Sequence, residues 1–193
     1  MAGRLVLVRH GATEWTKSGQ HTGRTDIPLL EEGKAQARAV GSYLRNHGLA
    51  TFDLILTSPL CRASATCGLA GFEGEFEPDL LEWDYGDYEG VASRDIRQGR
   101  PGWTLWEQGV PGGERAADVG RRVDRVIGRA RKQAGDTLCV AHGHVLRVLA
   151  ARWLGLPPVA GRLFLLSVGA ACVLGWDGDS PALELWNLVP DPI

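Results

Sequence analysis

The chain has 193 residues, of which 44% are hydrophobic and 23% are charged. These proportions are ordinary for a globular protein, and the length fits one domain spanning residues 1–193. The 21 basic and 23 acidic residues leave a formal net charge of −2, so we expect no general attraction to nucleic acid or to an anionic membrane. Because the N-terminus lacks a signal-peptide pattern and no window approaches the ~20 apolar residues of a membrane span, a cytoplasmic location is predicted.

Four cysteines are present, and their spacing matches no zinc-binding pattern and no C-x-x-C motif. We therefore expect four unpaired thiols in a reducing compartment. The cysteines are Cys61, Cys67, Cys139 and Cys172.

In the first half of the chain, short apolar runs alternate with segments of helical periodicity. Leu5–Val8 and Phe52–Thr57 are predicted strands. Each is followed by a predicted helix, the first over Glu31–His47 and the second from Ser58-Pro59 to Ala70. A short edge strand is expected at Phe76–Leu81.

The second half opens with a segment rich in Gly, Pro and Trp, Trp83–Gly113, which predicts loops around one short helix at Ser93–Gln98. The elements expected after it are a helix at Glu114–Ala134, a buried strand at Thr137–Ala141, an apolar helix at Val145–Leu154, and closing antiparallel strands at Leu163–Val168, Ala171–Gly175 and Leu183–Leu188. This order predicts an α/β fold: a three-layer α/β/α sandwich with a mostly parallel central sheet and an antiparallel edge.

Two predicted strands end in a histidine followed by glycine, at His10-Gly11 and at His142-Gly143. In open α/β sheets, ligands bind beyond the carboxyl ends of the strands, so both histidines are expected in one crevice. The glycines are expected to leave backbone N–H groups free to face an anion. With Arg9 and Arg62 nearby, this crevice suits a dianionic phosphoryl group.

A neutral imidazole can attack phosphorus without first losing a proton to a base. Nearby arginine charges keep such a ring neutral. Glu82, beside the aromatic residues Trp83 and Tyr85, is the candidate proton donor for the leaving alcohol. Each element alone is a weak signal, because a lone histidine at a strand end is more often structural than catalytic.

Four strings occur in order along the chain: RHGATEW at 9–15, TSPLCRASAT at 57–66, EWDYGDYEG at 82–90 and AHGH at 141–144. Together they resemble the histidine phosphatase superfamily, whose fold is phosphoglycerate mutase-like. Within this superfamily, the sequence resembles the sedoheptulose bisphosphatase and actinobacterial acid phosphatase type.

The resemblance implies that His10 is a phosphorylated nucleophile, that Glu82 is the general acid and then base, and that His142 completes the catalytic set. It implies a phosphate pocket containing Arg9 and Arg62. Further substrate contacts are expected from Thr16, Thr22, Gly23, Trp83, Tyr85, Gly143 and His144. Two of these depart from the common family pattern, since Thr16 replaces an asparagine and His144 replaces a glycine.

The same catalytic set serves phosphatases and cofactor-dependent phosphoglycerate mutases. The mutases usually carry ERxYG and a longer, lysine-bearing insertion, whereas this chain reads EWDYG and has three lysines in all. A small-molecule phosphatase is therefore predicted, with a mutase as the alternative and a non-catalytic phosphate-binding module as the third possibility. No metal and no cofactor are predicted, because His142-x-His144 lacks a third ligand at suitable spacing.

The substrate is predicted to be a small phosphate ester, such as a sugar phosphate or a phosphoglycerate-like compound. Candidate ligands for a second anionic group are Lys17, His21, Arg24, Arg94 and Arg97. Four tryptophans are placed to line the pocket mouth, namely Trp15, Trp83, Trp103 and Trp106. The arginine-rich side of the 114–132 helix is read as a solvated face, and the apolar stretch Leu163–Val189 as core or the face of a possible homodimer.

Overall fold

The structure is a computed structural model, and it describes residues 3–191. Its strands are β1 (Leu5–Arg9), β2 (Leu54–Thr57), β3 (Glu75–Phe76), β4 (Thr137–Ala141), β5 (Ala171–Asp177) and β6 (Ser180–Leu188). Its α-helices are α1 (Glu14–Ser18), α2 (Glu31–Asn46), α3 (Cys61–Leu69), α4 (Ser93–Gly99), α5 (Leu105–Gln108), α6 (Ala116–Ala130) and α7 (Gly143–Trp153). Three 3₁₀ turns span Pro78–Leu80, Gly86–Tyr88 and Pro158–Leu163.

The strands form one six-stranded sheet in the order β3-β2-β4-β1-β5-β6. The first four of these run parallel, while β5 pairs antiparallel with β1 and β6 antiparallel with β5. The central pair is in register with Leu7 opposite Cys139. The predicted fold class, a mostly parallel sheet with an antiparallel edge, is confirmed.

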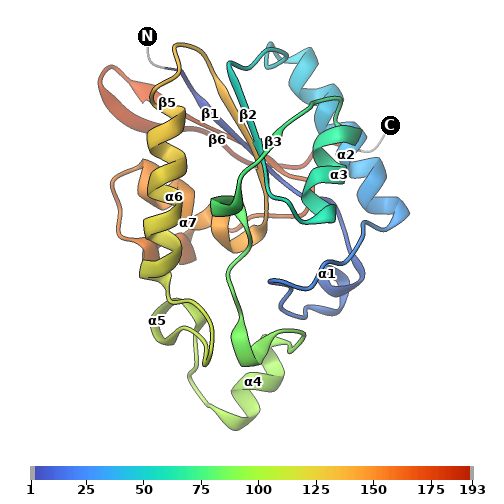
Figure 1. The fold of residues 1–193 in the computed structure, drawn as a ribbon, viewed down its shortest axis with the longest axis vertical. Coiled ribbons are helices and arrows are strands. Elements are labelled where there is room, and N and C mark those ends of the chain that lie inside the picture. Colours follow the sequence, from blue (N-terminus) through green and yellow to red (C-terminus); the bar gives the residue numbers. More distant parts are fainter. Residues whose placement is uncertain (1–2, 192–193) are drawn as a thin grey trace.

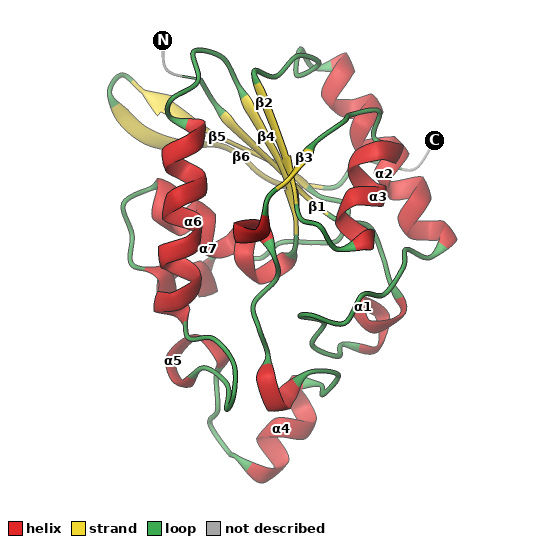
Figure 2. Cartoon of the chain, viewed as in Figure 1, coloured by secondary structure: helices red, strands yellow, loops and turns green. Residues whose placement is uncertain are grey.

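Helices cover both faces of the sheet (Figures 1 and 2), and the alternation of side chains along β1 explains why. Leu5 and Leu7 belong to the core that packs under α6 and α7. Val6 and Val8 point to the opposite face and join the core under α2 and α3. A strand that buries both faces reads as a continuous apolar run, as seen in the sequence.

Two predicted strands are wrong in place or in kind. No strand forms at Leu163–Val168, because the chain makes a 3₁₀ turn to Leu163 and then an irregular connection in which Leu165 is 74% exposed. At the other edge, β3 is two residues long and ends before Pro78, which starts a 3₁₀ turn. Proline fixes φ and lacks an N–H group, so it stops the ladder there.

The arginine-rich face of α6 is mostly solvated, as predicted, with the side chains of Arg121 and Arg125 69% and 63% exposed. Arg125 and Arg129 pair with Asp79 and Glu77, which lie in the segment just after β3. Arg122 forms a two-bond fork with Glu114 at 2.9 and 3.0 Å and is almost buried. The acidic partners of this face are therefore the chain's own residues, and they fasten α6 to the segment that leads into Glu82.

The carboxyl ends of the parallel strands open toward α1, α4 and α5, which lie beyond the sheet at the lower end of the molecule in Figure 1. Of these, α1 and α5 were not predicted from the sequence, since helices of five and four residues are too short to show periodicity. Within residues 3–191, no helix is long and apolar enough to cross a membrane.

Candidate active site

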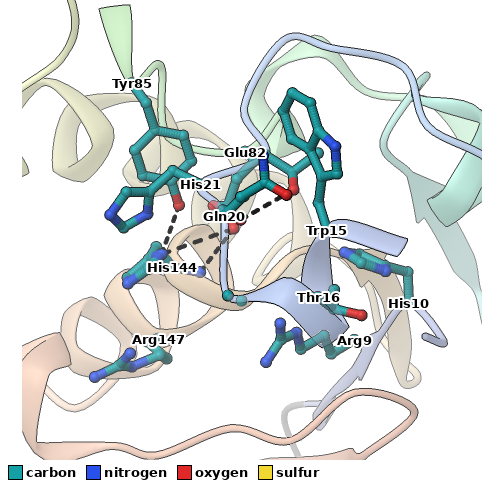
Figure 3. A pocket seen from close by; sticks show the side chains of 13 residues that line it. Arg9, His10, Trp15, Thr16, Gln20, His21, Glu82, Tyr85, His144 and Arg147 are labelled. Atoms are coloured by element: carbon teal, nitrogen blue, oxygen red, sulfur yellow. Dashed lines mark hydrogen bonds and ion pairs between the residues drawn. The ribbon is translucent and has the colours of Figure 1, made fainter. Parts of the chain in front are cut away.

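A cavity of about 190 Å³ lies at the carboxyl ends of β1 and β4 (Figure 3). His10 follows β1, while His142 follows β4 and is the N-cap of α7. Thirteen residues line the cavity: Arg9, His10, Trp15, Thr16, Gly19, Gln20, His21, Thr22, Glu82, Tyr85, Gly143, His144 and Arg147.

His10 is 97% shielded from solvent, and its Nδ1 atom lies 2.8 Å from the carbonyl oxygen of Gly11. A carbonyl oxygen only accepts hydrogen bonds, so Nδ1 carries the proton and Nε2 keeps its lone pair. Burial, and then the charges of Arg9 and Arg62, lower the pKa of His10 well below its ordinary value. The ring is therefore neutral at physiological pH, with an unprotonated Nε2.

The guanidinium group of Arg9 packs against the backbone of Gly143, where a Cβ atom would lie 3.1 Å from Cζ. Its Nη1 donates to the carbonyl oxygen of Leu166. Its Nε atom, in contrast, is out of contact with solvent and has no acceptor within residues 3–191. Its Nη2 atom also lacks a partner among the described residues but is not sealed from the cavity, so this N–H group is placed to donate to an oxygen of a bound ligand.

The carboxylate of Glu82 sits at the N-terminus of α7. Oε1 accepts the backbone N–H groups of Trp83 and Val145, both at 2.9 Å, and Oε2 accepts that of His144 at 3.0 Å. The two lone pairs of Oε1 are thus in use, whereas Oε2 keeps one free. Any proton that Glu82 exchanges with a ligand is therefore carried on Oε2.

His142 is enclosed and both of its ring nitrogens are occupied. Nδ1 accepts the Nε–H of Arg62 at 3.1 Å, so the proton of the neutral ring is on Nε2, which donates to Ser58 Oγ at 2.7 Å. The ring meets that of His10 edge-on, with centroids 5.1 Å apart. Burial, with the charge of Arg62 next, lowers the pKa of His142 well below its ordinary value.

Arg62 is fully buried and does not line the cavity. Its terminal nitrogens donate to the carbonyl oxygens of Thr22, Gly23 and Thr25. The loop that carries Thr22 is held from its other side by Glu89, which accepts the N–H groups of Gly23 and Thr25. Arg62 therefore acts on the cavity through its charge and through this loop, one layer behind the wall.

The structure brings eight of the twelve predicted site residues to the cavity. The other four, Arg62, His142, Gly23 and Trp83, lie directly behind its wall. Thr16 reaches the cavity, but its hydroxyl group already donates to the carbonyl oxygen of Thr13. Of the four tryptophans expected at the mouth, only Trp15 is in the lining, and Trp103 is core.

The expectation that the glycine after His10 frees backbone N–H groups for an anion is wrong. The N–H of Gly11 donates to Thr66 Oγ1, and that of Ala12 to Gln36 Oε1. Gly11 is needed for packing instead, because a Cβ atom there would lie 2.2 Å from the carbonyl oxygen of Gly33 on α2.

Of the residues expected to bind a second anion, only His21 lines the cavity. Lys17, Arg24 and Arg94 pair with nearby acidic side chains, and Arg97 donates to the carbonyl of Trp103. Arg147 also lines the cavity, and it was not predicted as a site residue. Its spacing of three residues from His144 on a predicted helix was the available signal.

No group of three or more His, Cys, Asp or Glu side chains is arranged to hold a metal ion in the described part of the chain. The prediction of a metal-independent site stays a prediction. The positive charge that lies in the cavity beside His10 is that of Arg9.

The chain belongs to the histidine phosphatase superfamily (branch 1), whose family model matches residues 5–189. The sequence is 36% identical to an acid phosphatase of Mycobacterium tuberculosis, over 98% of this chain and 96% of that protein. It is 38% identical to the sedoheptulose 1,7-bisphosphatase of Saccharomyces cerevisiae, over 79% of this chain and 68% of the yeast protein.

A 2,3-bisphosphoglycerate-dependent phosphoglycerate mutase of Brucella melitensis is 35% identical over 93% of this chain and 95% of the mutase. Among solved structures, the product of an open reading frame of Mycobacterium tuberculosis superposes with a TM-score of 0.92 at 35% identity, covering 97% of this chain and 98% of that one. The predicted family is confirmed, and the family together with the phosphatases among the relatives supports a phosphatase enzyme.

Proposed function

We propose that this protein is a metal-independent phosphomonoesterase of the histidine acid phosphatase type, which forms a phosphohistidine intermediate on His10. One observation carries the proposal. An imidazole with a free lone pair on Nε2 lines the same cavity as Arg9, whose Nη2 group is open to the cavity and lacks an acceptor among the described residues. A phosphoryl oxygen would satisfy that donor while its phosphorus atom faces the nucleophile.

In the first step, the lone pair of His10 Nε2 forms a bond to phosphorus as the ester P–O bond breaks. The leaving alkoxide takes a proton from Glu82 Oε2. In the second step, Glu82 removes a proton from a water molecule, whose oxygen attacks phosphorus as the P–N bond breaks, and inorganic phosphate leaves. Arg9 stabilises the charge on the equatorial oxygens, and Arg62 and His142 support it from behind.

The substrate class that we propose is the small phosphorylated metabolites, either sugar phosphates or phosphoglycerate-like esters. The phosphatase and bisphosphatase names of the relatives support this class, and the small volume of the cavity supports a small alcohol. A cytoplasmic location and a homodimer formed through 163–189 stay predictions.

A phosphoglycerate mutase is the second candidate, because the Brucella relative is a mutase with almost the same identity and coverage. A mutase differs in outcome only, since it returns the phosphoryl group to a bound hydroxyl rather than to water. The EWDYG segment and the scarcity of lysine favour hydrolysis.

The test is to incubate the protein with p-nitrophenyl phosphate and a chelator, and to stop the reaction early in alkali, in which phosphohistidine survives. We expect nitrophenol release, and a base-stable, acid-labile phosphoprotein that is absent from His10→Ala. Dependence on 2,3-bisphosphoglycerate, with phosphoryl transfer between phosphoglycerates and no hydrolysis, would establish the mutase instead. Phosphate binding without either activity would leave a binding module.

A further inference from the structure

The wall of the cavity opposite Arg9 holds a buried pair of polar side chains, Tyr85 and His144 (Figure 3). The Tyr85 hydroxyl oxygen lies 2.6 Å from Nδ1 of His144. Tyr85 is only 2% exposed and lies in the EWDYGDYEG segment at 82–90, while His144 is in the first turn of α7. The proposed reaction requires neither side chain.

The pair has a preferred arrangement of protons. Burial raises the pKa of Tyr85 well above its ordinary value, and burial with the charge of Arg147 lowers that of His144 well below. Both groups are therefore neutral. The hydroxyl of Tyr85 has no other partner within residues 3–191, so its proton is paired only if it donates to Nδ1. The imidazole proton is then on Nε2.

The imidazole is held in a fixed orientation. The backbone N–H of His144 donates to Glu82 Oε2. The imidazole ring lies against Trp106 and Trp83, with centroid distances of 5.4 and 6.2 Å. Tyr85 is held in turn by His21, which stacks on its ring at 4.5 Å. Nε2 of His144 has no protein partner among the described residues and is not sealed from the cavity.

We propose that Tyr85 is a positioning residue that keeps the proton of His144 on Nε2, and that His144 thereby determines specificity by donating this hydrogen bond to the leaving alcohol. The inference deepens the proposed function and rests on it. An uncharged donor at this place favours phosphate esters whose alcohol carries a hydroxyl or carbonyl oxygen close to the ester bond, as in polyol phosphates.

A matched pair of substrates tests this inference, namely glycerol 1-phosphate and propyl phosphate, which differ only in the hydroxyl groups. We expect the wild type to prefer glycerol 1-phosphate in kcat/KM. The preference should fall about tenfold in His144→Leu and several-fold in Tyr85→Phe, the size of one neutral hydrogen bond. His144→Gln, which keeps an N–H donor on a side chain of similar reach, should restore part of it.

A double-mutant cycle separates positioning from packing. If Tyr85 acts through His144, Tyr85→Phe should change the preference in the wild type and leave it unchanged in the His144→Leu background. Equal effects in both backgrounds would overturn the proposal. Tyr88→Phe is the control, because Tyr88 lies in the same segment, accepts a bond from Arg100, and does not line the cavity.

Nitrogen NMR of the ¹⁵N-histidine-labelled protein reads the tautomer without turnover. We expect His144 to show a protonated Nε2 and an unprotonated Nδ1, and Tyr85→Phe to mix the two tautomers. A proton on Nδ1 in the wild type would overturn the inference. Because this measurement uses the free protein, it gives its answer even if the proposed phosphatase activity fails, and that activity is judged separately by nitrophenol release.

Discussion

The two histidines that end β1 and β4 look equivalent in sequence, since each closes an apolar strand and precedes a glycine. The structure separates them. His10 keeps Nε2 unprotonated and lines the cavity, whereas both nitrogens of His142 are engaged, by Arg62 and by Ser58. Burial keeps both rings neutral.

This difference shows that a neutral, buried histidine is not by itself a nucleophile. The lone pair must also face the ligand, and which nitrogen has it is set by the partner of the other nitrogen. For His10 that partner is a carbonyl oxygen, and for His142 it is a guanidinium N–H. This difference supports our proposal that His10 forms the bond to phosphorus and that His142 has a supporting role.

The largest expected effect comes from replacing the two histidines in turn. His10→Ala should lower kcat by at least about 10⁴-fold with little change in stability, because it removes the group that we propose as the nucleophile. His142→Ala should lower kcat by about 10²-fold and also destabilise the fold by ~2 kcal/mol, because Nε–H of Arg62 loses its acceptor. The measurements are initial rates and urea unfolding. Equal losses of kcat would contradict the comparison.

The next effect concerns Glu82, whose Oε2 is the atom left to carry a proton. Glu82→Gln should lower kcat by about 10²–10⁴-fold for alkyl phosphates, whose alkoxides need a proton. The loss should be much smaller for p-nitrophenyl phosphate, since nitrophenolate leaves without one. The ratio of the two rates is the readout. A uniform loss for both substrates would show that Glu82 matters only by accepting backbone N–H groups at the N-terminus of α7.

The phosphoryl end of the cavity was predictable from sequence, because strands with buried faces show as apolar runs and their last residues share one edge of the sheet. Arg9, His10 and Glu82 were found in this way and through the family motifs. On the opposite wall of the cavity, Tyr85 and His144 were expected from the family resemblance, but Arg147 was not. Arg147 reaches this wall by stacking on Trp106, which comes from α5, a helix too short to show periodicity.

Arg62 shows a second reason for the remaining errors. Its position in the first turn of α3 was predicted, but the direction of its guanidinium group was not, because that depends on three carbonyl oxygens of the 22–25 loop. Loop conformation is fixed by distant contacts, here with Glu89, rather than by local pattern. The strand predicted at Leu163–Val168 was wrong for a similar reason, since apolar composition alone does not distinguish a strand from an exposed connection.

The glycines that follow the two histidines sharpen the comparison. Gly11→Ala should destabilise the fold by about 3 kcal/mol, since the new Cβ would meet backbone that cannot move away, at 2.2 Å. Gly143→Ala meets the guanidinium of Arg9 at 3.1 Å, which can shift. It should raise KM several-fold with little loss of stability. Unfolding in urea and steady-state kinetics on both variants decide this, and the reverse pattern would contradict the packing role of Gly11.

The smallest effect is on the pH dependence of stability, and it uses a third buried histidine. Burial lowers the pKa of His21 from 6.5 to about 4. Between these two values the unfolded chain binds more protons than the folded one, so stability falls as pH falls from 7 toward 4. For His21 alone, the free energy of unfolding should drop by about 1–2 kcal/mol between pH 7 and pH 5.

His10 and His142 change stability in the same direction, because burial lowers the pKa of both. The His21→Asn variant isolates the contribution of His21. Its absolute stability changes too, but the informative result is a shallower slope of the free energy of unfolding with pH. His47→Gln, at an exposed histidine on the far end of α2, is the control and should keep the wild-type slope. If His21→Asn also kept that slope, His21 would not be held neutral by burial. The imidazole ring that stacks on Tyr85 would then become charged when the pH falls below 6.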